Sequence, residues 1–329
     1  MMHIGALATD FHSSSIRMRD MLYLEKDRLV KFVKSIQPEA PLGEIVILCT
    51  CNRIELYYVC DDHNVAAEWL TEYLAAFHRV SVSHLKNTLV NHRCAGAVRH
   101  LFRVASGVES MVFGEHEILG QIRDAYFFCR EQDSTDSYLN RLFQQAIATG
   151  KLVRNKTGAG RGSLSVPSIA VELLLEKSGG TLEFTNVMVV GTGTMGLRTI
   201  KRISLKKTAA LGICNRTGER AVKLCERFNA THIPFTDLKT KIKDYNAIIL
   251  ATSSQEYILS ADDVLFNCET RKKNLLVIDL GVPRNADPSI GAIDGVTLAC
   301  IDDLKTTADR HLQERENEIG EIECIIEEQ

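Results

Sequence analysis

The sequence lacks several features that would assign a protein to a class at once. No apolar stretch approaches the roughly 20 residues of a membrane-spanning helix, and the start carries no basic-then-apolar targeting signal. The ten cysteines include no C-x-x-C pair, and the close pair Cys49 and Cys51 has no Cys or His at zinc-site spacing beside it. We therefore expect a soluble cytoplasmic protein with reduced thiols, no metal site and no membrane partner.

A strong charge of either sign is also lacking. The net charge is −3, from 39 basic and 42 acidic residues, so bulk charge does not indicate a protein that coats nucleic acid. Any RNA partner has to be recognised by local residues. At 329 residues the chain is long enough for two domains of ordinary size and a long helix.

The first 156 residues are predicted to form a small α/β domain, with strand-like and helix-like patterns in alternation and a helical region from about residue 65. The expected elements are a strand, a long helix, a strand pair and three later helices, at residues 4–8, 16–36, 45–48 with 54–59, 95–105, 118–130 and 138–154.

A second domain is predicted at 157–301. The glycine-rich basic segment 156–163 indicates a flexible crossing between domains, and regular β-then-α alternation follows it. That alternation is typical of a Rossmann-type parallel sheet wound on both faces. The expected elements are helices at 166–177, 195–205 and 219–228 and strands at 187–190, 209–214, 247–251, 275–279 and 296–301. Residues 302–329 predict the start of one long amphipathic helix.

The segment Gly191-Thr-Gly-Thr-Met-Gly196 follows an apolar strand and opens a predicted helix. In that context its glycines allow a tight turn and let backbone N–H groups meet a pyrophosphate, as in a dinucleotide fingerprint. The alternative is a glycine-rich turn beside an empty crevice. The candidate cofactor-binding residues are Gly191, Thr192, Gly193, Thr194, Met195, Gly196, Asn215, Arg216 and Thr217.

The end of the next strand distinguishes the two nicotinamide cofactors. An NAD site places a carboxylate there to hold the ribose 2′-hydroxyl, whereas Asn215-Arg216-Thr217 offers a guanidinium with amide and hydroxyl donors. A planar guanidinium suits a 2′-phosphate, so we predict NADPH as the cofactor. The alternative is that Arg216 only caps an exposed turn.

A thiol stands where the apolar run 45–48 ends, in the turn of the predicted strand pair. Loop tips on a rigid sheet often carry function, which favours Cys51 as a nucleophile over the common buried, structural cysteine that we expect at Cys49. An unperturbed thiol has a pKa of about 8.5 and is mostly protonated at neutral pH, so catalysis requires neighbouring positive charge or a base. Arg53 can supply the charge.

Four histidines are candidates for a base or a leaving-group contact: His84, His92, His100 and His116. His100 is a polar residue on an apolar-patterned helix, so we expect it to face a partner or a pocket rim. His116 is the second choice. A satisfied core histidine is the alternative for His100.

Taken together, these residues resemble the glutamyl-tRNA reductase family over nearly all of the chain. The matching segments are Thr50-Cys-Asn-Arg-Ile-Glu-Leu-Tyr57, Val98-Arg-His-Leu-Phe-Arg-Val-Ala-Ser-Gly107, Ser110, Gly114-Glu115, Ile118-Leu-Gly-Gln121, Ser165-Val-Pro-Ser-Ile-Ala-Val-Glu172, the 191–196 fingerprint, Asn215-Arg-Thr217 and Asp279-Leu-Gly-Val-Pro-Arg284.

The resemblance implies that Cys51 attacks the ester joining glutamate to its tRNA. The resulting thioester would be reduced by NADPH to glutamate-1-semialdehyde, the entry compound of tetrapyrrole (porphyrin and haem) synthesis. Glutamyl-tRNA is the implied substrate, a glutamate-1-semialdehyde aminomutase is an implied partner, and His100 is implied to be important for activity. The implied glutamyl-binding residues are Thr50, Asn52, Arg53, Ser110, Glu115, His116, Glu117 and Gln121.

The chain departs from the family pattern in two places. Where the family usually has Glu-Pro-Gln, this chain has Glu115-His116-Glu117, which replaces a neutral amide with a carboxylate. The family generally continues into a helical dimerisation domain, whereas this chain ends at Gln329 inside the expected long helix. The family is homodimeric, and the state of this chain is left open.

Two other functions compete with this reading. A shikimate-type NADP-dependent dehydrogenase has a cofactor half that resembles Asn215-Arg-Thr-Gly-Glu-Arg-Ala221, but it uses a lysine and aspartate pair in its first domain. No matching motif occurs before Gly160. A tRNA- or haem-responsive regulator with haem-binding cysteines is the non-enzymatic alternative, and it leaves the 191–196 fingerprint without a role.

Overall fold

The computed structural model describes residues 2–36, 40–115, 117–157, 165–268, 274–304 and 316–329. The chain forms two compact units, unit 1 with Met1–Leu164 and His311–Gln329, and unit 2 with Ser165–Arg310. Most of the glycine-rich crossing expected at 156–163 lies outside the described residues. Among the helices of these ranges, none combines the length and the apolar character needed to cross a membrane.

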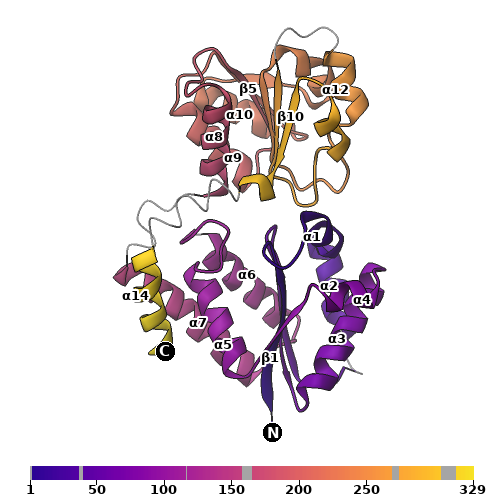
Figure 1. The fold of residues 1–329 in the computed structure, drawn as a ribbon, viewed down its shortest axis with the longest axis vertical. Coiled ribbons are helices and arrows are strands. Elements are labelled where there is room, and N and C mark those ends of the chain that lie inside the picture. Colours follow the sequence, from indigo (N-terminus) through magenta and orange to yellow (C-terminus); the bar gives the residue numbers. More distant parts are fainter. Residues whose placement is uncertain (1, 37–39, 116, 158–164, 269–273, 305–315) are drawn as a thin grey trace. The chain divides into compact units, whose positions relative to one another are not determined.

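Unit 1 is a four-stranded antiparallel sheet in the order β2-β3-β1-β4, with α5, α6 and α7 on one side and α2 and α3 on the other (Figure 1). Its elements are β1 (His3–Asp10), α1 (Ile16–Leu22), α2 (Lys26–Ile36), β2 (Glu44–Cys49), β3 (Arg53–Cys60), α3 (His63–His78), α4 (Val82–Lys86), β4 (Val90–Arg93), α5 (Ala95–Ser106), α6 (Glu117–Glu131), α7 (Ser137–Lys156) and α14 (Glu316–Glu327).

The predicted strand pair is confirmed as the β2–β3 hairpin, whose register places Cys49 opposite Ile54. Every residue of β3 is buried, because helices cover both faces of the sheet. The four residues between Cys49 and Ile54 form a tight turn that carries Cys51. The sheet therefore holds the predicted nucleophile at a fixed end of two buried strands.

Two expectations for unit 1 are wrong. The helix predicted over 16–36 is two helices, because Tyr23 adopts an extended conformation and Leu24 donates its N–H to the Cys49 sulfur at 3.3 Å. The region expected to be helical from residue 65 contains the edge strand β4. It has four residues, none fully buried, so no apolar alternation revealed it.

Unit 2 is a six-stranded parallel sheet in the order β10-β9-β8-β5-β6-β7, which confirms the doubly wound fold. The sequence analysis missed only short elements, notably β7 and α12. The elements are α8 (Val166–Lys177), β5 (Asn186–Val190), α9 (Thr194–Ser204), β6 (Ala210–Cys214), α10 (Gly218–Phe228), β7 (Thr231–Ile233), η2 (Phe235–Asp237), α11 (Leu238–Lys241), η3 (Ile242–Asp244), β8 (Ala247–Leu250), α12 (Ala261–Cys268), β9 (Leu275–Asp279), η4 (Pro288–Ala292), β10 (Val296–Cys300) and η5 (Ile301–Leu304).

Residues 305–315 of the long helix expected over 302–329 lie outside the described residues, and residues 302–304 form part of the 3₁₀ turn η5. Asp303 accepts the Cys300 N–H at 2.7 Å, and this local bond favours the 3₁₀ turn η5 over an α-helix. The helix observed near the end is α14, which packs on α5 and α7 and adds the buried Ile322 to the core of unit 1. Arg99 of α5 binds Glu327 of α14 through two nitrogens, at 2.6 and 2.9 Å.

Candidate functional site

The hairpin turn that carries Cys51 is held by backbone contacts. The Thr50 hydroxyl accepts the N–H groups of Asn52 and Arg53, each at 3.2 Å, and the Thr50 N–H donates to the Arg53 carbonyl at 2.9 Å. The buried Arg19 of α1 donates its Nε to the Cys51 carbonyl at 3.3 Å. The turn therefore has one conformation, with the Cys51 side chain partly exposed.

The surroundings of Cys51 keep its thiol protonated. Desolvation, and after it the carboxylates of Glu115 and Glu117, raise the pKa of Cys51 to about 12, and Arg19 acts in the opposite direction. The expectation that Arg53 would supply the activating charge is not met, because the nearby cation is Arg19. A further positive charge beside the sulfur would favour the thiolate.

Arg53 is buried and engaged within the protein. Its Nη1 donates to Glu55 Oε1 at 2.6 Å and its Nη2 donates to the carbonyl of Glu109. The guanidinium was expected to clamp a substrate carboxylate. In the structure both of its terminal nitrogens already have acceptors on the chain. The Glu109 carbonyl, one of the two, lies in the turn that leads to Ser110.

Glu55 is the centre of a buried polar cluster. Besides Arg53 it accepts the Tyr57 hydroxyl at 2.5 Å, and its Oε1 lies 3.0 Å from His100 Nε2. Burial opposes the charge of Glu55, yet His100 and Arg53 hold the pKa of this carboxyl well below its ordinary value. Glu55 in turn holds the pKa of Arg53 above its ordinary value despite burial.

His100 is brought to this cluster from α5, and its pairing with the buried Glu55 also fits the alternative of a satisfied core histidine. Its ring also stacks on His92 with centroids 4.1 Å apart. The sequence analysis gave Glu55 no role. The available signal was the two-residue period of β3, which places Arg53, Glu55 and Tyr57 on one face of a buried strand, where charged residues have to be paired.

The acidic side of the site is formed by the segment that leads into α6. Burial and then Glu117 raise the pKa of Glu115 to about 7, against the opposing influence of Arg53 and Ser110. Gln121 lies one helical turn after Glu117, on the same face of α6. The expected His116 lies outside the described residues.

Asn52 contributes an unsatisfied acceptor. Its side chain is 6% exposed, and its Oδ1 has no hydrogen-bond partner in the part of the chain that the structure describes. Buried polar atoms are nearly always paired, so this oxygen is available to a donor brought by a ligand.

The fingerprint of unit 2 has the backbone that a dinucleotide requires. Gly191 has φ +105°, and a Cβ there would lie 2.2 Å from the Ala251 carbonyl oxygen. A Cβ at Gly196 would lie 2.0 Å from the Gly191 oxygen, whereas a Cβ at Gly193 would meet nothing within 4 Å. The first and third glycines thus permit close packing, and the second leaves open space before the N-terminus of α9, as a pyrophosphate needs.

The end of β6 lies against this fingerprint. Asn215 accepts the Thr192 N–H at 3.2 Å and donates to the Thr217 carbonyl at 3.0 Å, so it joins the two loops. Arg216 is exposed and has no partner among the described side chains, which leaves its guanidinium available to a phosphate. These residues fit NADPH.

The sequence analysis missed polar residues at the neighbouring strand ends. Asn285 Oδ1 accepts both the N–H and the hydroxyl of Thr252, at 3.1 and 2.7 Å, just after β8. Asp279 at the end of β9 accepts three backbone N–H groups and orders this loop. Burial raises the pKa of Asp279 to about 6. Polar residues directly after apolar strands were the available signal.

Comparison with known proteins decides the family. Residues 7–157 match the N-terminal domain model of glutamyl-tRNA(Glu) reductase, and residues 173–307 match the shikimate/quinate 5-dehydrogenase model. The glutamyl-tRNA reductase of Archaeoglobus fulgidus is 34% identical in sequence over an alignment that covers 100% of this chain and 72% of the relative. That of Priestia megaterium is 31% identical over 99% of this chain and 73% of the relative. The chain belongs to the glutamyl-tRNA reductase family.

A solved structure agrees with this assignment. The glutamyl-tRNA reductase of Methanopyrus kandleri has a TM-score of 0.51 and 31% identity, over 99% of this chain and 78% of that one. The resemblance found in the sequence is confirmed. The similarity to shikimate-type dehydrogenases is limited to residues 173–307, in unit 2. Membership of an enzyme family disfavours the alternative of a regulatory protein.

Removing the carboxylate of Glu55 should destabilise the protein. The Glu55→Gln substitution leaves a buried guanidinium without its anion, at a cost of about 3–5 kcal/mol in the free energy of unfolding at pH 7. Chemical denaturation measures this cost. The matched control is Glu68→Gln. Glu68 forms an exposed ion pair with Lys86 at 3.1 Å, and loss of this pair should cost about 0–1 kcal/mol. Equal effects would contradict the central role of Glu55.

The pH dependence of this difference follows from the lowered pKa of Glu55. A carboxyl with a depressed folded-state pKa contributes fully above its unfolded pKa of about 4.3 and loses this contribution as the pH falls. The gap in stability between the unmodified chain and Glu55→Gln should therefore stay constant from pH 7 to about 5 and narrow in more acidic solution.

Restoring the family amide at position 117 should activate Cys51. In Glu117→Gln one of the two carboxylates that raise the pKa of the thiol is removed, so Cys51 should react faster with iodoacetamide at a fixed pH. Peptide mass spectrometry reads the rate for each cysteine. Glu131→Gln, at the far end of α6, is the control and should leave the rate unchanged.

Proposed function

We propose that this chain reduces glutamyl-tRNA to glutamate-1-semialdehyde with NADPH, the first step of tetrapyrrole synthesis by the C5 route, and that Cys51 is its nucleophile. The observation that supports this role is the position of the thiol at the tip of the β2–β3 hairpin, beside the half-buried carboxylates of Glu115 and Glu117. Membership of the glutamyl-tRNA reductase family supports the substrate and the cofactor.

Activation of Cys51 is coupled to binding of the glutamyl group. The α-ammonium of that group meets the carboxylate of Glu115 and the free Oδ1 of Asn52, and its positive charge offsets the negative charge beside the sulfur. The pKa of Cys51 falls as a result. The thiolate is therefore generated only where the substrate is bound.

The chemistry proceeds through an acyl-enzyme. The Cys51 thiolate attacks the ester carbon, a C–S bond forms, the C–O bond to the terminal ribose breaks, and the ribose hydroxyl leaves with a proton. NADPH, when bound, supplies the hydride that reduces the thioester carbon, so that the C–S bond breaks and the aldehyde and the thiol are released.

Arg53 and His100 act on the site through Glu55. The guanidinium holds the Glu109 carbonyl and thereby the turn that carries Ser110, while His100 is fixed between Glu55 and His92. Arg53 can bind a substrate carboxylate only by giving up one of these contacts. Thr50 shapes the turn, and Glu117 and Gln121 line the acidic side on α6.

The cofactor is held in unit 2. Gly193 and the N-terminus of α9 would hold its pyrophosphate, and Arg216 with Thr217 would bind the 2′-phosphate. A cytoplasmic location, a homodimer and direct transfer of the aldehyde to an aminomutase belong to the same proposal, supported by the free cysteines and by the family resemblance.

The acyl-enzyme can be tested without the cofactor. Mixing the protein with glutamyl-tRNA and no NADPH should add one glutamyl group to the peptide that contains Cys51, and Cys51→Ser should abolish this adduct while leaving NADPH binding unchanged. Cys49→Ser is the matched control and should keep the adduct, because the Cys49 sulfur is already engaged by the Leu24 N–H at 3.3 Å. An adduct that persists in Cys51→Ser would remove the mechanism.

The choice of cofactor depends on one side chain. Arg216→Ala should lower the ratio of NADPH to NADH affinity by about tenfold or more, since a charge-assisted bond contributes about 1.5–3 kcal/mol. Fluorescence titration with both nucleotides measures the ratio. Arg220→Ala, also exposed and four residues further on, should leave it unchanged, and an unaltered ratio in Arg216→Ala would contradict the assignment.

A further inference from the structure

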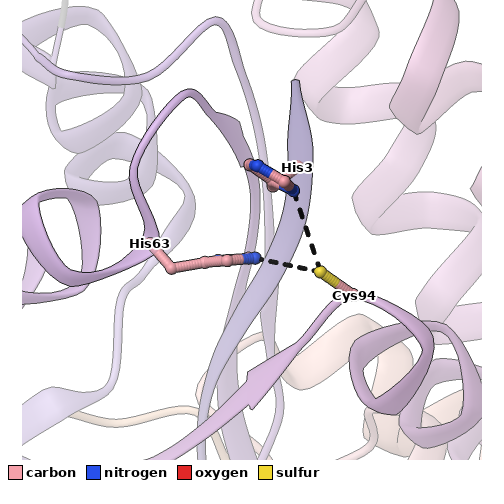
Figure 2. Close-up of side chains that lie close together, drawn as sticks. All are labelled: His3, His63 and Cys94. Carbon is pink, nitrogen blue, oxygen red and sulfur yellow. Dashed lines mark hydrogen bonds between the residues drawn. The ribbon is translucent and has the colours of Figure 1, made fainter. Parts of the chain in front are cut away.

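A second group of reactive side chains lies in unit 1, at the end of the sheet that does not carry Cys51. His3 opens β1, His63 opens α3, and Cys94 stands between β4 and α5 (Figure 2). Both imidazole rings point toward the Cys94 sulfur. His63 Nε2 lies 3.3 Å from it and His3 Nδ1 lies 3.9 Å from it. The hairpin tip is at the other end of β3, about 23 Å away at 3.3 Å per residue.

The three donor atoms have the spacing that a metal ion requires. All of them lie within 4.8 Å of one another. Around a tetrahedral zinc ion, with bonds of about 2.3 Å to sulfur and about 2.0–2.1 Å to nitrogen, a sulfur and a nitrogen stand about 3.6 Å apart. The observed separations of 3.3 and 3.9 Å lie on either side of that value.

Cys94 is held toward the histidines by an unusual backbone. Its φ and ψ are 49° and −122°, a conformation that residues other than glycine rarely adopt. The helix-ending residues Arg79 and Asn229 also have positive φ, but their angles are those of an ordinary left-handed helix cap. The Cys94 N–H donates to the Ile4 carbonyl at 2.8 Å, which fixes the thiol beside the start of β1. Conformations of this kind concentrate at functional sites.

The second nitrogen of His63 also has a neighbour. Its Nδ1 lies 3.9 Å from the sulfur of the buried Cys60. With Nδ1 turned toward Cys60, Nε2 of the same ring faces Cys94 and can offer its lone pair to a metal ion in the cluster. A metal-bound histidine commonly has such an outer contact, which orients the ring.

We propose that His3, His63 and Cys94 form a zinc site that is separate from the Cys51 site. Two imidazoles and one thiolate make a donor set that Zn²⁺ favours, and three protein ligands leave the fourth position to water or to another donor. The ion ties together the starts of β1, α3 and α5. Since α5 also carries His100, the site fixes the first turn of the helix that supports the Glu55 cluster.

Calorimetric titration of the full chain with zinc chloride tests the site. The titration should use the Cys51→Ser variant, so that the Cys51 thiol does not compete for zinc. Adding Cys94→Ser or His63→Ala should weaken zinc binding by at least about tenfold, because changes outside the ligand shell already cost about 10- to 100-fold. Adding Cys324→Ser, an exposed cysteine of α14, is the control and should have no effect.

Two readouts keep the test independent of folding defects in the variants. In the unmodified chain, zinc should slow alkylation of Cys94 by iodoacetamide and leave that of Cys324 unchanged. With Co²⁺ in place of zinc, a thiolate-to-metal absorption band should appear in Cys51→Ser and vanish when Cys94→Ser is added. Equal zinc affinity with and without Cys94, no protection of Cys94, or binding of copper but not zinc would overturn the proposal.

Discussion

The buried ion pair of Arg53 and Glu55 is the interaction on which the rest of unit 1 depends. Two opposite charges on one face of a fully buried strand are unfavourable there unless each is satisfied, and here the carboxylate is shared among a guanidinium, a phenol and an imidazole. The cluster joins β3 to α5, and through the Glu109 carbonyl it reaches the turn that holds Ser110. The catalytic surface is therefore specified by polar contacts made inside the core.

Around Cys51, in the same unit, neighbouring charges oppose ionisation of the side chain, whereas in the Glu55 cluster they favour it. Desolvation and two carboxylates favour the neutral thiol of Cys51. A thiolate at this position would be open to oxidation. In the proposed mechanism, the cation of an incoming substrate would favour the thiolate only at the time of binding, so the oxidisable form of Cys51 would be short-lived.

Much of the fold follows from the sequence, and the exceptions have identifiable causes. The central strands of unit 2, such as β5 and β9, are buried on both faces and read as continuous apolar runs, so their positions in the sequence could be predicted. The break after Leu22 depends on the Cys49 sulfur, which is 25 residues from Leu24 in sequence. The strand β4 gave no pattern, because three of its four residues are exposed.

The residues of the candidate sites also fall into two groups, those that local sequence rules predict and those that depend on long-range contacts. Cys51, Arg216 and the three glycines of the fingerprint stand at strand ends and follow from local rules. The pairing of Arg53 with Glu55 lies within one strand, and the two-residue period of β3 was its signal. The grouping of His3, His63 and Cys94, in contrast, joins segments up to 91 residues apart. No spacing rule within one segment reports a contact of that range, and only the register of β1 between β3 and β4 brings the three together.

The packing of α14 on α5 and α7 has a consequence for synthesis on the ribosome. Ile322, Ile325 and Ile326 belong to a core whose other buried members lie before residue 154, so the hydrophobic interior of the first lobe can close only after residues 165–310 have been synthesised. Residues 165–310 form their own sheet within that interval. The nucleotide-binding lobe can therefore mature as an insertion while its host is still incomplete.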